Sequence, residues 1–350
     1  MIDAEVIKVF SGSGSDRENL EFTDQALLTW LLSCTDGADP ASLAQALAGH
    51  LGTDATEAYK MVEFFIENGV LVTTATSARY RVKGEPWERR GWRDAFDFHA
   101  ATTGLRFEKL WGSDYARELF ESYVADPTFG PQPTIFKDTP PGQGQSLGDG
   151  VAWDPLPVSA VLERRTIADG PAAATVGMDA VASLLSHAFA TQRTMEIMVL
   201  GPHQQRSYPS GGARHPLELY VGVRRVPGIE AGVYHYDPLS KELTRVAGSD
   251  AAEQLDAAAP QAVSAPVVLF MTSRWIRHLW KYRYARSYRM VLMEAGHAAQ
   301  SLRMAGAALG LDVVSTAQVA ETAITRLLGL EDQWDESPLY VLAVNGGRDR

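Results

Sequence analysis

Three stretches in the second half of the chain carry side chains that could hold an anionic ligand or move a proton. The first is Leu162-Glu-Arg-Arg-Thr166, in which Arg164 and Arg165 are adjacent. A guanidinium binds a phosphate through two parallel hydrogen bonds, so such a pair suits a phosphorylated ligand. Taken alone, however, an arginine pair more often belongs to a solvated surface.

The second stretch runs from Arg206 to Glu218 and contains Pro209-Ser-Gly-Gly212 just before a predicted strand. Glycines let backbone N–H groups approach a ligand closely, and the Ser210 hydroxyl can hydrogen-bond a heterocycle or a phosphate. The alternative is a glycine-rich turn that only leads into the strand.

The third stretch, Trp280-Lys-Tyr-Arg-Tyr-Ala-Arg-Ser-Tyr-Arg289, is predicted to begin one long helix over Trp280–Leu309. Lys281 can act as a base if burial or nearby cations lower its pKa, and Arg283 and Arg286 are close enough in sequence to contribute. The alternative is a basic amphipathic helix whose long side chains reach into solvent.

Alternating helices and strands over residues 156–350 must position these stretches. The predicted helix covers Met178–His187, with a possible extension to Arg193. The predicted strands are Leu217–Val223, Val233–Tyr236, Glu242–Val246, Pro266–Thr272 and Leu339–Asn345. This mixture favours an α/β or α+β sandwich. The absence of GxGxxG and GxxxxGK[ST] patterns gives no support for a dinucleotide fingerprint or a P-loop.

The first part of the chain reads as a separate small domain over residues 1–85. Three helices are predicted, the second opening at Asp39-Pro40 and the third covering Thr53–Asn68. Two short β-like runs over residues 70–74 and 78–82 would form a hairpin, which together with the helices is typical of a winged helix. Because this part is not markedly basic, we expect a docking domain rather than a nucleic-acid-binding one.

Residues 86–155 are expected to form a helical connector followed by a Pro- and Gly-rich linker, which leaves 156–350 as the third domain. The net charge of −11 argues against non-specific binding to nucleic acid or to anionic membranes. Cys34 is the single cysteine, so neither an internal disulfide nor a cysteine-based metal site is expected, and no metal site is predicted. No signal peptide or membrane span is recognisable, which favours a cytoplasmic protein.

Together the three stretches resemble the SagB/McbC-type dehydrogenases, a branch of the FMN-dependent nitroreductase superfamily. The resemblance covers about Leu162 to Arg348. It is carried by Arg164-Arg-Thr166, PSGGARHPLE at 209–218, GVYHYDP at 232–238, WKYRYARSYR at 280–289 and AGHAAQSLRMAGAALGL at 295–311. It implies an α+β flavin sandwich that forms a homodimer, with FMN at the subunit interface.

The resemblance also implies roles for individual residues. Lys281 and Tyr282 match the Lys-Tyr pair of the azoline dehydrogenases and would be catalytic. The residues implied to contact FMN are Arg164, Arg165, Thr166, Arg206, Pro209, Ser210, Gly211, Gly212 and Arg348. Thr166 stands where the family usually has serine, and Ala213-Arg-His215 replaces the more usual Ala-Leu-Tyr.

The activity implied is oxidation of thiazoline or oxazoline rings in a ribosomally made precursor peptide to thiazoles or oxazoles, beside a cyclodehydratase partner. The N-terminal domain resembles, in pattern alone, small domains that bind leader peptides. Two alternatives stay open. One is a flavin reductase of dehydroamino acids, quinones or nitro compounds, and the other is a flavin-free subunit that only docks peptide and partner.

Overall fold

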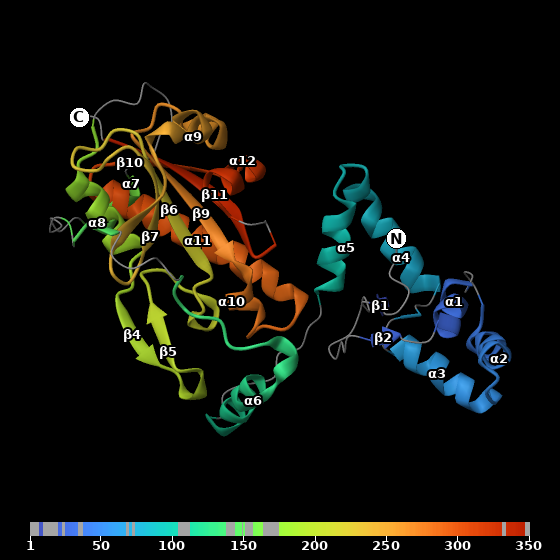
Figure 1. Ribbon diagram of the computed structural model, residues 1–350. Helices are drawn as coiled ribbons and strands as arrows, with labels where there is room; N and C mark the ends of the chain where they lie inside the picture. Colours follow the sequence, from blue (N-terminus) through green and yellow to red (C-terminus); the bar gives the residue numbers. More distant parts are fainter. Residues whose placement is uncertain are drawn as a thin grey trace. The chain divides into compact units, whose positions relative to one another are not determined.

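The computed structural model of the 350-residue chain describes residues 7–9, 20–22, 25–33, 38–67, 70–71, 74–103, 113–137, 144–148, 150, 157–163, 175–330 and 334–346. The chain divides into two compact units, Met1–Lys109 and Leu110–Arg350 (Figure 1). Within the described ranges, no helix is both long and apolar enough to cross a membrane.

The N-terminal unit contains the predicted helices. Its elements are β1 (Ile7–Val9), β2 (Leu20–Phe22), α1 (Gln25–Ser33), α2 (Pro40–Leu51), α3 (Ala55–Glu67), α4 (Thr74–Glu88) and α5 (Arg93–Ala101). Helix α2 begins at Pro40 because the Asp39 carboxylate accepts the N–H groups of Ala41 and Ser42 at 3.0 Å each. It ends where Gly52 adopts a φ of +69°. The buried core of α1–α3 comprises Trp30, Ala44, Leu47, Ala58, Val62 and Phe65.

The predicted hairpin over residues 70–82 is wrong, because Ala78–Val82 lies inside α4. Tyr80, Gly84 and Trp87 recur at helical spacing, and that face of α4 packs on Phe96 of α5. The ring of Phe96 lies 4.8 Å from that of Tyr80 and 5.7 Å from that of Trp87. Packing against α5 therefore stabilises the helix more than the β-like alternation of residues 78–82 favours a strand. A winged-helix identity for this unit stays a hypothesis.

The second unit is built on an antiparallel sheet with the order β10-β11-β9-β6-β7-β8-β3 in the described residues. Its strands are β3 (Gly144–Ser146), β6 (Leu217–Val223), β7 (Gly232–Asp237), β8 (Glu242–Ala247), β9 (Val267–Arg274), β10 (Asp312–Thr316) and β11 (Glu336–Asn345). A separate pair joins β4 (Arg193–Glu196) and β5 (Pro202–Gln205). The five predicted strands are confirmed, whereas β10 and the β4–β5 pair were not predicted, and β3 lies in the segment predicted to be a linker. The unit is an α+β fold, as expected.

Helices cover both faces of this sheet. Helices α8 (Met178–Ala188) and α11 (Tyr288–Ala308) pack on one face, and α9 (Ala252–Ala258) and α12 (Glu321–Leu327) pack on the other. The unit also contains α6 (Ser113–Ala125), α7 (Val158–Glu163) and α10 (Trp275–Leu279). Short 3-10 turns are η1 (Pro127–Phe129), η2 (Met198–Leu200), η3 (Gly211–Ala213), η4 (Ser249–Ala251), η5 (Pro260–Ala262) and η6 (Ala285–Ser287). The predicted helix from Met178 ends at Ala188, and Arg193 instead begins β4.

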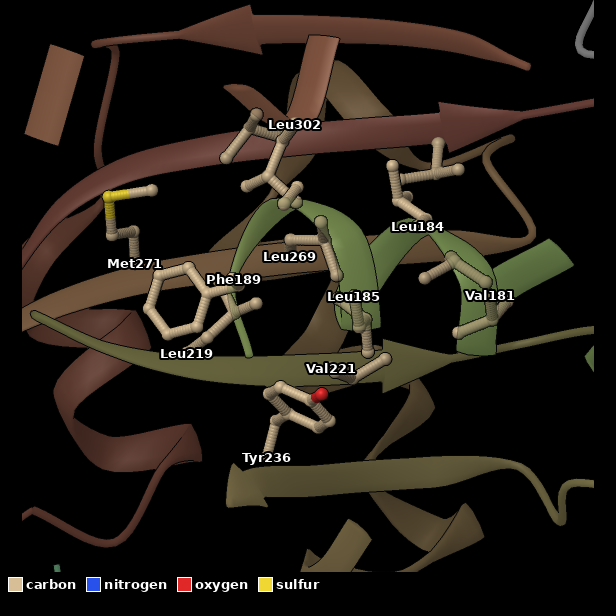
Figure 2. Packing of buried hydrophobic residues seen from close by; sticks show 14 of the residues in the cluster. Val181, Leu184, Leu185, Phe189, Leu219, Val221, Tyr236, Leu269, Met271 and Leu302 are labelled. Atoms are coloured by element: carbon tan, nitrogen blue, oxygen red, sulfur yellow. The ribbon is translucent and has the colours of Figure 1, made fainter. Parts of the chain in front are cut away.

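Strand β6 is buried on both faces, which explains its continuous apolar sequence. Leu219 joins the core formed with α8 and α11, whereas Tyr220 joins the core formed with α9 and α12. Figure 2 shows the first core, in which side chains of α8 and α11 meet the sheet at Leu184, Leu185, Leu219, Val221, Leu269 and Leu302. Each large apolar side chain buried in this way contributes about 1.5–3 kcal/mol.

The prediction of one helix over Trp280–Leu309 is wrong in its first turns. Helix α10 ends at Leu279 and α11 begins at Tyr288, with a non-helical loop and η6 between them. Contacts with residues distant in sequence stabilise this non-helical loop. The Trp280 indole donates to the Gly130 carbonyl oxygen at 3.2 Å. The Arg283 guanidinium pairs with Asp126 at 2.9 Å.

Candidate functional site

The Pro209–Gly212 turn has an unusual backbone conformation. Gly212 has a φ of +57°, but Ala213 and His215 also have positive φ values, of +54° and +41°. Such conformations cost a residue with a Cβ about 1–3 kcal/mol and cluster at ligand sites. The turn therefore stores strain immediately before β6.

The glycines of this turn are needed for close contact with the loop that follows α10. A Cβ on Gly212 would lie 2.5 Å from the Tyr282 hydroxyl oxygen and 2.8 Å from Lys281 Nζ. A Cβ on Gly211 would lie 2.6 Å from Met290 Cε. The structure thus brings together two predicted parts of the site, which lie about 70 residues apart in sequence.

Lys281 is half-buried, and its ammonium nitrogen lies 4.6 Å from the centre of the Phe120 ring of α6. Burial and the nearby Arg214 guanidinium lower the pKa of Lys281 from 10.5 to about 8. The cation responsible is not one of those expected from sequence, since Arg283 pairs with Asp126 instead. A substantial fraction of Lys281 is therefore neutral near physiological pH.

Tyr282 keeps its proton over the same pH range. Burial is the main cause that raises the pKa of Tyr282 to about 12. Its ring packs on that of His278, with centroids 4.7 Å apart. His278 is 1% exposed, and burial lowers its pKa to about 4. The phenol is a hydrogen-bond donor here, and Lys281 is the better proton acceptor.

A buried carboxyl group lies behind the turn. The Ser210 hydroxyl donates to Glu294 of α11 at 2.7 Å and accepts the N–H of His215 at 2.9 Å. Burial raises the pKa of Glu294 to about 7, although the Ser210 hydroxyl opposes this. Sequence reasoning missed Glu294. Its position one residue before Ala295, on the buried face of a helix rich in small residues, was the available signal.

The residues predicted to contact FMN fall into three groups according to their position in the structure. Pro209, Ser210, Gly211 and Gly212 form the turn itself. Arg206 is 8% exposed, and its guanidinium donates within the protein to Gln204, Tyr208 and the Leu217 carbonyl. The remaining four, Arg164, Arg165, Thr166 and Arg348, lie outside the described residues.

Several buried polar atoms around the turn have no hydrogen-bond partner within the described part of the chain. They are Arg214 Nη2, His215 Nδ1, both ring nitrogens of His278 and Glu294 Oε1, of which His215 Nδ1 and Glu294 Oε1 face each other at 3.7 Å. Buried polar groups are normally paired, and such a cluster is what a polar heterocyclic ligand would satisfy. The donors, acceptors and aromatic rings present fit a flavin ring system.

A family model described as the nitroreductase family matches residues 163–348. The chain is 33% identical over 177 residues to the trifolitoxin-processing protein TfxB of Rhizobium leguminosarum bv. trifolii, which covers 49% of this chain and 47% of that protein. It is 32% identical over 145 residues to the microcin B17-processing protein McbC of Escherichia coli, with coverage of 39% and 53%. The chain thus spans about half the length of these curated relatives.

A nitroreductase-like protein from Anabaena variabilis has a similar solved structure, with a TM-score of 0.51 and 22% identity. The likeness covers 65% of this chain and 45% of that one and concerns the fold alone. These findings confirm the resemblance and the α+β fold expected from the sequence.

Proposed function

Since the chain belongs to the nitroreductase family, we propose that it is an FMN-dependent oxidoreductase that converts thiazoline or oxazoline rings of a ribosomally made peptide to thiazoles or oxazoles. Proteins of this family typically bind flavin. The observation that carries the proposal is the contact of Lys281 and Tyr282 with the Gly211-Gly212 turn, because a lysine whose pKa is lowered to about 8 lies beside the strained turn.

FMN, when bound, would supply the hydride acceptor for the oxidation. The turn residues Pro209–Gly212 would hold its ring through backbone groups and the Ser210 hydroxyl. Arg164, Arg165, Thr166, Arg206 and Arg348 remain the proposed contacts to the rest of the cofactor.

The side chains of the site have complementary tasks in this chemistry. The ring proton next to the former peptide carbonyl is acidic and needs an acceptor within hydrogen-bond reach. The neutral Lys281 amine would accept that proton. The Tyr282 phenol would donate a hydrogen bond that orients the amine or the substrate, and the Phe120 ring would limit the access of water to Lys281 Nζ.

The peptide substrate is inferred from two relatives whose names describe processing of trifolitoxin and of microcin B17. A precursor peptide and a cyclodehydratase partner are accordingly part of the proposal, as are a cytoplasmic location and leader or partner docking by the N-terminal unit. The domain limits 1–85, 86–155 and 156–350 belong to it as well.

A homodimer is supported by apolar side chains that α10 and α11 leave exposed. Ile276 and Leu279 of α10 are 42% and 49% exposed, and Leu292 and Met293 of α11 are 44% and 56% exposed. Exposed apolar residues concentrated on neighbouring helices are typical of an interface between subunits.

Two measurements on the purified full-length protein test the proposal. Flavin absorbance after incubation with FMN decides whether the cofactor binds, and a protein that stays colourless would contradict it. Anaerobic bleaching of that absorbance by an azoline-containing precursor peptide tests the activity. Bleaching only by reduced nicotinamide, without any response to the peptide, would favour the flavin reductase.

A further inference from the structure

Arg214 is a buried cation that acts on Lys281, and no acid among the described residues neutralises its charge. It is 0% exposed, and in the described part of the chain no carboxylate forms an ion pair with it. Its Nε donates to the Arg277 carbonyl at 2.7 Å, and its guanidinium carbon lies 5.7 Å from the centre of the Trp280 ring. Nη2 has no hydrogen-bond partner among the residues that the structure describes.

These contacts fix Arg214 against the backbone that leads directly to Lys281. Trp280 is the residue before Lys281, and Gly212, two residues before Arg214, has its Cβ position 2.8 Å from Lys281 Nζ. An uncompensated buried charge is costly, so a fold that keeps one at such a place usually uses its field.

The other titratable groups near Lys281 are either uncharged near neutral pH or act on a residue other than Lys281. His203 of β5 and His278 of α10 both have pKa values lowered by burial, with Arg214 and Lys281 contributing to each. Tyr282 keeps its proton, and the charge of Glu294 on α11 acts on Tyr282. Among the described groups, the cation that acts on Lys281 is therefore Arg214.

We propose that Arg214 is a positioning residue for proton transfer, whose buried charge favours loss of the proton from the Lys281 ammonium group and so makes the amine available as a proton acceptor. The role in proton transfer rests on the proposed function. The experiment below measures only the protonation of Lys281 and does not depend on that function. Two positive charges close together in a poorly solvated site repel each other. The Lys281 ammonium loses its proton more easily than the Arg214 guanidinium, so the repulsion lowers the pKa of the lysine.

Competitive labelling of the full-length, FMN-incubated protein with acetic anhydride tests this directly. The rate of Lys281 acetylation, read by mass spectrometry and normalised to an added small amine, is measured from pH 6 to pH 11. The plateau at high pH reports accessibility, and the midpoint reports protonation. We expect a wild-type midpoint near 8. A midpoint near the ordinary value of 10.5 would overturn the inference.

Arg214→Gln and Arg214→Met remove the charge, and Gln keeps a donor for the Arg277 carbonyl. In either folded variant the midpoint should move towards 10.5 without reaching it, because burial remains. The labelling rate at pH 8 should fall on the order of threefold to tenfold relative to the plateau. Arg214→Lys retains the charge and should restore most of the effect. Arg286→Gln, a charge removed from the same loop, is the matched control and should leave the midpoint unchanged.

An unchanged midpoint in Arg214→Gln and Arg214→Met would show that burial alone sets the state of the amine, which would reject the role of Arg214. The labelling needs no peptide substrate. A shifted midpoint in a protein that never oxidises azolines would therefore support the Arg214 assignment while rejecting the proposed function.

Discussion

Lys281 and Tyr282 are adjacent in sequence but have opposite protonation behaviour. Burial favours the neutral form of each, and this lowers the pKa of the lysine and raises that of the tyrosine. One side chain therefore accepts a proton near neutral pH while the other donates a hydrogen bond. This division of roles at one surface of the Gly211-Gly212 turn is the basis of the proposed catalysis.

Lys281→Ala and Tyr282→Phe should retain flavin and fold normally but lose activity. Loss of the acceptor is expected to slow anaerobic flavin reduction by about 10²–10⁴-fold. In the wild-type protein, the rate should rise as the pH increases through about 8, because Lys281 becomes neutral above its pKa. Near-normal rates in both variants would place the base elsewhere.

Glu294 should make the folded protein less stable as the pH rises. Its pKa is raised from 4.5 to about 7 in the folded state, so the native chain holds the proton more tightly than the unfolded chain. The stability contributed is complete below 4.5 and is lost as the pH rises through 7.

Glu294→Gln should remove this dependence while keeping an acceptor for Ser210. Relative to wild type, the variant should gain on the order of 2 kcal/mol in free energy of unfolding between pH 5 and pH 8. Urea titrations at the two pH values measure this. Glu196→Gln, the loss of an exposed acid in β4, is the control. Parallel pH profiles for wild type and Glu294→Gln would show that the carboxyl is ionised in the folded protein.

At the scale of elements, the site depends on two irregular segments rather than on a helix or strand. One is the strained turn before β6, and the other is the loop between α10 and α11. Both are held by rigid neighbours, since β6 lies inside the sheet and Ser287, before α11, bonds the Tyr282 carbonyl at 3.1 Å. This is an arrangement in which small backbone shifts would misplace reactive groups.

Gly212→Ala should impair activity more than stability. The added methyl group would displace Lys281 and Tyr282, and the positive φ adds strain of about 1 kcal/mol. Gly310→Ala is the matched control, because Gly310 has a φ of +73° with nothing within 4 Å of its Cβ position. The two variants should have similar melting temperatures, but only Gly212→Ala should slow flavin reduction. Equal activity in both would show that the close contact is not required.

At the scale of the whole molecule, the unit Met1–Lys109 and the unit Leu110–Arg350 have separate cores. All of the candidate site described above belongs to the second unit. The first unit offers no comparable cluster of catalytic side chains in its described residues.

Deletion of residues 1–109 should therefore leave flavin binding intact and weaken the affinity for the precursor peptide. Flavin occupancy by absorbance and peptide affinity by fluorescence anisotropy measure the two effects. Full peptide affinity in the truncated protein would reject the docking role. Loss of flavin together with aggregation would show that the unit instead supports the fold of the second.

The sequence alone identified the family branch and the strands at the centre of the sheet, and it predicted the Lys281-Tyr282 pair as the catalytic residues. These features depend on local pattern: apolar runs of strand length, glycines before a strand and a short basic motif. The starts of the helices at Pro40 and near Thr53 could also be predicted from sequence, because the capping residues lie within a few positions of the helices that they begin.

Tertiary structure decided the features that depend on residues distant in sequence. Packing on Phe96 made residues 78–82 helical, and contacts of Trp280 with the Gly130 carbonyl interrupted the predicted long helix. Burial and the charge of Arg214, which is 67 positions away in sequence, lower the pKa of Lys281, whereas Arg283 pairs with Asp126. Charge interactions depend on distance and burial in the folded chain, and sequence separation measures neither.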